Sequence, residues 1–195
     1  MDTSETGLEK IIVDWLRDKN GYEQVTPHDY NKTFALVESW VERFVTTTQS
    51  DKVKESMCFA SPSERLKFFT RLSGEIGKRG VVDVLRKGYK FNGNTFDLYY
   101  PLPSQLNQGA KAAYKQNIFG VIRQVRYSTQ NTNEIDFVVF INGLPLATFE
   151  LKNNYTGQTY ENAIKQYQTE RDPKELLLQK KRCAVHFAVD DQQVW

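Results

Sequence analysis

The chain has 195 residues, of which 39% are hydrophobic and 13% aromatic, enough to bury a core in one large domain or two small ones and too many for a disordered protein. A formal net charge of +2 excludes a global positive charge as the means of attracting a polyanion, and two cysteines without paired spacing exclude a zinc site or a disulfide scaffold. The amino terminus lacks the features of a secretory signal, and no apolar run approaches the roughly 20 residues that span a bilayer, so we expect one cytoplasmic domain with no membrane partner.

The first part of the chain has the apolar spacing of helices. Its first helix is amphipathic and is expected to end near Asn20. Within KFNGNTFDLYY, the pair Asn92-Gly93 is flanked by aromatic and β-favouring residues and predicts a hairpin. We interpret residues 22–115 as a largely helical insertion between the first helix and the rest of the fold. The predicted helices cover residues 5–18, 34–44 and 63–87, the last with a break around Gly74 to Gly80.

From about residue 117 the pattern changes to strands with one further helix. Three consecutive segments, FGVIRQVRYS, EIDFVVFI and LATFELK, are rich in β-favouring residues and are separated by turn signals that contain asparagine. Residues 157–170 then have helical spacing, and RCAVHFAVD at residues 182–190 is typical of a mostly buried strand. This order predicts an α/β fold with residues 116–190 as its core: a mixed sheet of four or more strands flanked by helices.

Glu150 and Lys152 interrupt the apolar strand LATFELK, two residues apart. Because side chains alternate along a strand, both point to one face, where burying a carboxylate and an ammonium is costly unless each has a partner. Asp136, in the preceding strand, supplies a second carboxylate. Two carboxylates can hold Mg²⁺, which polarises a phosphodiester and lowers the pKa of a bound water, while Lys152 orients that nucleophile or neutralises the transition state. The three residues are therefore predicted to form the catalytic centre of a metal-dependent phosphodiesterase.

A shared metal site requires Asp136 and Glu150 to lie on the same face of an antiparallel hairpin. In an antiparallel hairpin, the numbers of any two facing residues add up to the same value. A two-residue turn at Asn142-Gly143 gives a sum of 285, whereas Asp136 and Glu150 require 286. We therefore predict a three- or five-residue loop, or a β-bulge, around residues 141–145, where Pro145 suits a bulge better than a ladder position. An unbulged two-residue turn would place the two carboxylates on opposite faces.

Two interpretations compete at this position. A Glu-x-Lys pair in a strand is most often a surface ion pair, and the sheet would then be a non-catalytic module that docks onto a partner or holds DNA. The presence of Asp136 favours an enzyme, because a scaffold has no need for all three groups. His186, inside an apolar strand, is predicted to be a satisfied core side chain rather than a ligand.

One stretch of the sequence is recognisable. NEIDFVVFINGLPLATFELKN, followed by a helix that contains AIKQYQ and then by RCAVHFAVD, closely resembles the amino-terminal nuclease domain of the restriction (R, motor) subunit of type I restriction-modification enzymes, a branch of the PD-(D/E)xK nucleases. The resemblance covers almost the whole chain and includes ETGLEKIIVDWLRDKNGY and RGVVDVLRKGYKFNG, with NGLPLATFELKN as its most specific piece. It implies a PD-(D/E)xK nuclease core and the activity of a type I site-specific deoxyribonuclease in host defence.

The resemblance also assigns individual residues. Asp136, Glu150 and Lys152 match the family's Asp...Glu-x-Lys triad. The two carboxylates are then metal ligands for Mg²⁺, with the backbone carbonyl of Leu151 as a further ligand. Glu9 matches an acidic residue on the first helix that approaches the metal in related nucleases.

The family carries a Gln-x-x-x-Tyr motif on the helix after the triad, with a supporting role in DNA binding. Gln166 matches its glutamine, but Glu170 stands in the place of the tyrosine. In such enzymes a downstream motor hydrolyses ATP to pull double-stranded DNA past a complex that also contains methyltransferase and specificity subunits. The chain has no G-x-x-x-x-G-K-[ST] loop, so ATP is not expected to bind it. Its end at Trp195, just after a strand, favours a piece of a longer subunit over a stand-alone repair or resolvase-type nuclease.

Overall fold

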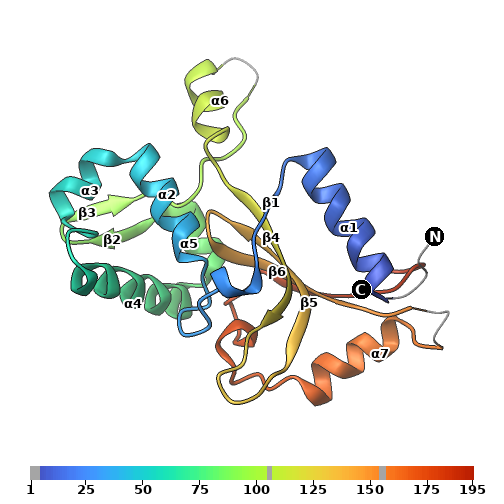
Figure 1. Ribbon diagram of the computed structural model, residues 1–195. Helices are drawn as coiled ribbons and strands as arrows, with labels where there is room; N and C mark the ends of the chain where they lie inside the picture. The colour runs from blue at the N-terminus through green and yellow to red at the C-terminus, as the bar shows by residue number, and fades with distance from the viewer. Residues whose placement is uncertain (1–4, 105–106, 154–156) are drawn as a thin grey trace.

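A five-stranded mixed sheet lies at the centre of the computed structural model (Figure 1), which describes residues 5–104, 107–153 and 157–195. The strand order is β1-β4-β5-β6-β7. The two central pairings, β4 with β5 and β5 with β6, are antiparallel, and the two outer pairings are parallel. The predicted mixed sheet is thereby confirmed. Its strands are β1 (Glu23–Gln24), β4 (Phe119–Arg126), β5 (Glu134–Ile141), β6 (Leu144–Leu151) and β7 (Val185–Val189).

Helix α1 (Glu5–Asn20) covers one face of the sheet, and it ends where the sequence predicts. Val13, on its apolar side, belongs to a buried cluster with Phe137 of β5 and Leu151 of β6. Because strand side chains alternate, Glu150 points to the opposite face. The packing of α1 therefore decides which face of β6 carries the candidate site.

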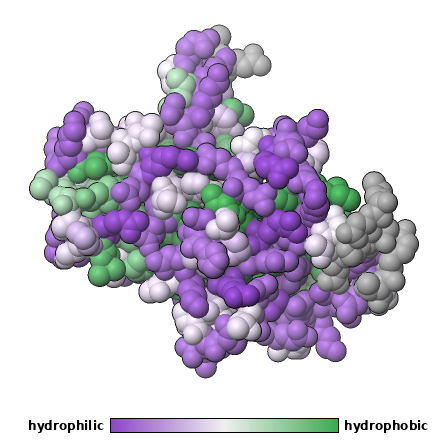
Figure 2. All heavy atoms as spheres, viewed as in Figure 1, coloured by the Kyte–Doolittle hydropathy of each residue, from purple (hydrophilic) through white to green (hydrophobic). Residues whose placement is uncertain are grey.

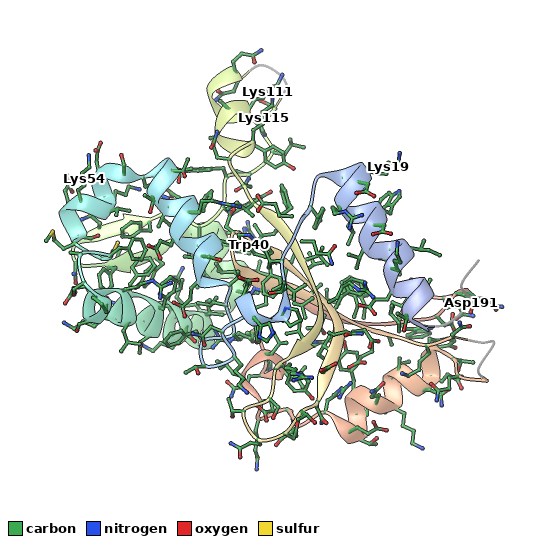
Figure 3. All side chains as sticks on the ribbon, in the orientation of Figure 1. Lys19, Trp40, Lys54, Lys111, Lys115 and Asp191 are labelled. Carbon is green, nitrogen blue, oxygen red and sulfur yellow. The ribbon has the colours of Figure 1, made fainter. Side chains whose placement is uncertain are left out.

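The segment between β1 and β4 packs against the opposite face of the sheet. Its buried side chains and those of the strands form one continuous apolar cluster. Trp40 extends from α2 toward the sheet (Figure 3), where its ring contacts Phe140 and fills the space above Gly120 that a Cβ atom would need. Residues 23–24, within the range predicted as the insertion, form β1 of the central sheet. The segment contains α2 (Glu38–Thr48), α3 (Ser50–Ser56), α4 (Pro62–Arg79), α5 (Val81–Lys87), β2 (Tyr89–Phe91), β3 (Asn94–Phe96) and the projecting helix α6 (Gln108–Tyr114).

Two helix boundaries in this segment differ from the prediction. Helix α2 begins at Glu38 rather than at residue 34, because Ala35 has a φ of 52° and the preceding residues close a turn between Asn31 and Leu36. Helix α4 continues through Gly74, so the predicted break is wrong there and occurs only at Gly80. A glycine inside a helix costs only about 1 kcal/mol relative to alanine, which the buried apolar face of α4 outweighs.

The hairpin between β5 and β6 combines a two-residue turn with a β-bulge. In Asn142-Gly143 both residues have positive φ angles, 49° and 84°, as a type I′ turn requires. The register then shifts by one residue, so that Phe137 faces Phe149 and facing residue numbers sum to 286. Continued by one residue, this register sets Asp136 opposite Glu150. A bulge is therefore present and the condition for a shared site is met, but the extra residue is Leu146 rather than one within residues 141–145. The expectation for Pro145 is wrong, because it pairs with Phe140 in the ladder.

Replacing Gly143 by alanine is expected to destabilise the fold more than the same change at Gly93, the equivalent position of the β2–β3 turn. Their φ angles of 84° and 82° cost an alanine about 1–2 kcal/mol in each case. A Cβ atom at Gly93 has nothing within 4 Å, whereas at Gly143 it would meet the carbonyl oxygen of Val37 and the side chain of Val41. This overpacking adds about 1–3 kcal/mol. Urea denaturation of both variants measures the difference, and equal losses would contradict the expectation.

The face seen in Figure 2 is mostly hydrophilic, and its apolar residues lie in small separate patches. Within residues 5–104, 107–153 and 157–195, no helix has both the length and the apolar character needed to cross a bilayer. Cys58 and Cys183 are both buried free thiols.

Candidate metal-dependent catalytic site

Glu150, near the end of β6, lies at the centre of the candidate site. Its side chain is 1% exposed and forms an ion pair with Arg171, whose side chain is 8% exposed. The Nε and Nη2 atoms of Arg171 lie 2.8 and 2.6 Å from Oε1 of Glu150. The other carboxylate oxygen, Oε2, is buried and has no hydrogen-bond partner among the described residues. An unpartnered carboxylate oxygen in a buried place is costly, so this atom is available to a hydrogen-bond donor or a cation.

The surroundings of Glu150 raise the pKa of its carboxyl group from 4.5 to about 7. Burial is the main cause, and the negative charge of Asp136 adds to it. The positive charges of Arg171 and Lys152 lower this pKa but do not offset the rise. A divalent cation beside the two carboxylates would favour the ionised form of Glu150, because it offsets both causes.

Asp136 extends from β5 toward the backbone of β6. Its Oδ2 atom accepts a hydrogen bond of 2.5 Å from the backbone N–H of Leu151. The bond and the strand register keep the carboxylate close to Glu150, in agreement with its effect on the pKa of that residue. The β4 residue in register with Asp136 is Gln124, which has a φ of 50°. Distortions of this kind in a strand are uncommon and gather at functional sites.

Lys152 directly follows β6 and continues its geometry. Its backbone N–H donates a hydrogen bond of 2.8 Å to the carbonyl oxygen of Val189 in β7, so the alternation of side chains extends to Lys152 and puts it on the face of Glu150. Its charge lowers the pKa of Glu150, as expected of a nearby ammonium group. The structure thus brings Asp136, Glu150 and Lys152 together. The predicted ligand role of the Leu151 carbonyl stays a prediction.

Gln166 begins a π-helical turn (Gln166–Glu170) that follows α7 (Tyr160–Lys165). The helix predicted over residues 157–170 therefore begins at Tyr160 and changes its winding at Gln166. Oε1 of Gln166 is buried and lacks a hydrogen-bond partner among the described residues, whereas Glu170 is exposed. π-Helical turns are found frequently at functional sites.

Glu9 has a different partner from the one that the family resemblance implies. It is buried on α1, where its Oε1 atom accepts a hydrogen bond of 2.6 Å from Nε of Arg123. Arg123 faces Phe137 in the sheet, so this ion pair lies on the α1 face rather than on the face of Glu150. The structure does not bring Glu9 together with the triad, and a ligand role for Glu9 would require Arg123 to release it.

His186 and two neighbours form a hydrogen-bonded row on the same face as Glu150. The hydroxyl of Thr148 lies 2.6 Å from Nδ1 of His186 and 2.8 Å from the hydroxyl of Tyr167. His186 thus has a hydrogen-bond partner, as predicted, but its side chain is half-buried rather than part of the core. A cavity of about 480 Å³ lies beside this row and is lined in part by Tyr167, His186 and Arg171.

Arg171 is the main contributor to the site that the sequence did not reveal. The predicted helix covers residues 157–170 and stops one residue before Arg171, so it gives no reason to pair this residue with Glu150. The available signal was the position of Arg171 directly after Glu170, where the motif tyrosine is missing. A guanidinium is always charged and can pair with a buried carboxylate, so an arginine directly after Glu170 is a candidate partner for the triad.

The carboxylate ligands that the site offers fit a hard cation that retains several water ligands. In the described part of the chain, no three His, Cys, Asp or Glu side chains gather where they could hold a metal ion. Mg²⁺ commonly uses one or two carboxylates plus water and phosphate oxygens, so Asp136 and Glu150 are a sufficient protein contribution. The unpartnered Oε2 of Glu150 is the atom that most clearly fits this role.

Comparisons with known proteins identify the family of the chain. No curated protein matches the chain at a significant level. The model of the family described as "Type I restriction enzyme R protein N terminus" matches residues 2–195. The match includes both strands and the helix that contribute to the site. The chain therefore belongs to the family of amino-terminal domains of type I restriction enzyme R proteins.

Proposed function

We propose that this domain is the Mg²⁺-dependent DNA endonuclease of a type I restriction enzyme, with a PD-(D/E)xK active site at Asp136, Glu150 and Lys152. The observation that carries the proposal is the unpartnered Oε2 atom of Glu150, buried beside a second carboxylate and a lysine. A structural ion pair needs only one of the two carboxylates. A buried carboxylate with a half-buried one beside it is accounted for by a shared cation.

Each group has a distinct task in this mechanism. Asp136 and Glu150 would hold the Mg²⁺ ion, and Asp136 is itself oriented by the N–H of Leu151. The ion, when bound, polarises the phosphodiester and makes water a stronger nucleophile. Lys152 neutralises the negative charge that develops on the phosphate in the transition state, or orients the attacking water. Neither task requires contact with a particular base, which suits cleavage without sequence specificity.

The domain is proposed to act within a larger assembly. A motor in the same R protein would translocate double-stranded DNA at the expense of ATP and present it to this site. The methyltransferase and specificity subunits of the complex would supply recognition of the DNA sequence. The shortage of net positive charge in the domain agrees with this division of tasks, since the assembly rather than the domain would hold the DNA.

The rival function is a non-catalytic module in which Arg171 and Glu150 form a structural ion pair. Calorimetric titration of the chain with Mg²⁺ distinguishes the two. We expect binding by the wild type, no measurable binding by Asp136→Ala, and unchanged binding by Asp97→Ala, which removes an exposed aspartate that pairs with Lys52 away from the site. Equal binding by the wild type and Asp136→Ala would rule out this metal site.

A further inference from the structure

We propose that Arg171, which reaches the site through the π-helical turn that begins at Gln166, is a positioning residue of the metal site. The inference rests on the proposed function, because it gives Arg171 the task of orienting Glu150 toward the cation. It assigns a role to a residue outside the triad.

The π-helical turn determines which residue reaches the site. The backbone N–H of Arg171 donates to the carbonyl oxygen of Gln166 at 3.1 Å, so these residues are related by the five-residue step of a π-helix. In a regular α-helix the residue four positions after Gln166 would lie above it, and that residue is the exposed Glu170. The wider turn brings Arg171 to the site instead.

Arg171 is held independently of Glu150. Its Nη2 atom donates a hydrogen bond of 2.7 Å to the carbonyl oxygen of Glu134, at the start of β5. Its guanidinium carbon also lies 5.8 Å from the centre of the Tyr127 ring. These contacts fix the guanidinium on the sheet, so Glu150 adapts to Arg171 rather than the reverse.

The position of Arg171 determines how Glu150 can bind a cation. Nε of Arg171 donates its hydrogen bond to Oε1, and Nη2 lies 2.6 Å from the same oxygen, which leaves Oε2 as the oxygen presented to the ion. Glu150 is thereby restricted to binding through one oxygen, beside Asp136. A lysine would carry the same charge but not the planar pair of N–H groups that sets this orientation.

An alternative role for Arg171 predicts the opposite change in affinity. If Arg171 merely competed with the cation for Glu150, removing it would strengthen metal binding by freeing a carboxylate. If it positions Glu150, removing it weakens binding, because the carboxylate is then free to rotate or to take up a proton in its buried place. Loss of a group that orients a metal ligand typically weakens affinity by about 10–100-fold.

The test is titration of the chain with Mn²⁺ alone. Binding is measured by calorimetry and by the decrease of the electron-spin resonance signal of the free ion. We expect Arg171→Lys and Arg171→Met each to weaken Mn²⁺ binding at least about tenfold, with methionine the weaker binder. Arg126→Met is the matched control, because Arg126 of β4 forms a surface ion pair with Glu134 of β5. Arg171→Lys keeps the buried positive charge, so it still tests the inference if Arg171→Met fails to fold.

Unchanged or tighter Mn²⁺ binding by either variant would overturn the inference and leave the proposed function standing. Wild-type and Asp136→Ala chains that bind Mn²⁺ equally would instead overturn the metal site, and the role of Arg171 with it. Melting temperatures recorded in parallel separate positioning from stability, since a purely structural residue lowers the melting temperature without changing the dissociation constant of the folded chain.

Discussion

Replacing Lys152 by methionine is expected to slow DNA cleavage by about 10²–10³-fold, the usual effect of removing one group that stabilises a transition-state charge. Methionine keeps the length and apolar stem of the side chain and removes its charge. Mg²⁺ binding should persist, because Asp136 and Glu150 supply the ligands. The measurement is cleavage of a closed circular DNA by the reconstituted restriction complex in the presence of ATP, together with a calorimetric titration of the domain.

ATP hydrolysis provides the internal control for this experiment. It should proceed at the wild-type rate in the Lys152→Met enzyme, which shows that the complex assembles and that its motor runs. Lys165→Met is the matched variant, since Lys165 is an exposed lysine in the last turn of α7, and it should cleave like the wild type. Full cleavage by Lys152→Met would remove the lysine from the proposed mechanism.

Replacing Glu150 by glutamine is expected to stabilise the metal-free domain at pH 8, although it destroys the site. The pKa of Glu150 rises from 4.5 to about 7 on folding, so below pH 4.5 the acid is neutral in both states and costs nothing. Between pH 4.5 and 7 it ionises in the unfolded chain only, and the free energy of unfolding falls by about 3 kcal/mol, at 1.36 kcal/mol per pKa unit. Glutamine has the shape of the neutral acid and escapes this loss.

Urea denaturation at pH 5 and pH 8, in the presence of a chelator, measures this effect. The difference in unfolding free energy between Glu150→Gln and the wild type should grow as the pH rises through this window. Adding Mg²⁺ at pH 8 should then stabilise the wild type but not the variant, since binding to the native state adds to its stability. A variant less stable than the wild type at pH 8 would instead identify Glu150 as the anionic half of a structural ion pair.

The strands and the facing of Asp136 and Glu150 could be predicted from the sequence because both depend on local rules. Alternation fixes which side chains share a face, and an Asn-Gly pair fixes the turn. The bulge followed from counting, since a two-residue turn at Asn142-Gly143 and a facing pair of these carboxylates cannot both occur without an additional residue. The bulge in the structure meets this requirement.

Other parts of the site depend on contacts between distant segments. The pairing of Glu9 with Arg123 joins residues 114 positions apart, and nothing in the pattern of α1 distinguishes it from a metal ligand. Gln124 adopts a positive φ in a segment whose composition predicts a regular strand. Helix α4 keeps its winding at Gly74 because of the core on which it packs. Local patterns do not contain this information, since tertiary packing decides each case.

The π-helical turn also changes how the loss of a motif should be judged. A π-turn amounts to one residue inserted into an α-helix, and everything after the insertion is displaced by one position in an ungapped comparison. Such a comparison places Glu170 at the position of the tyrosine, so the motif appears to be lost. In the folded chain, however, Arg171 occupies the inward position above Gln166. In this segment the position of a side chain in space therefore differs by one residue from its position in a regular α-helix, and Arg171 rather than Glu170 reaches the site.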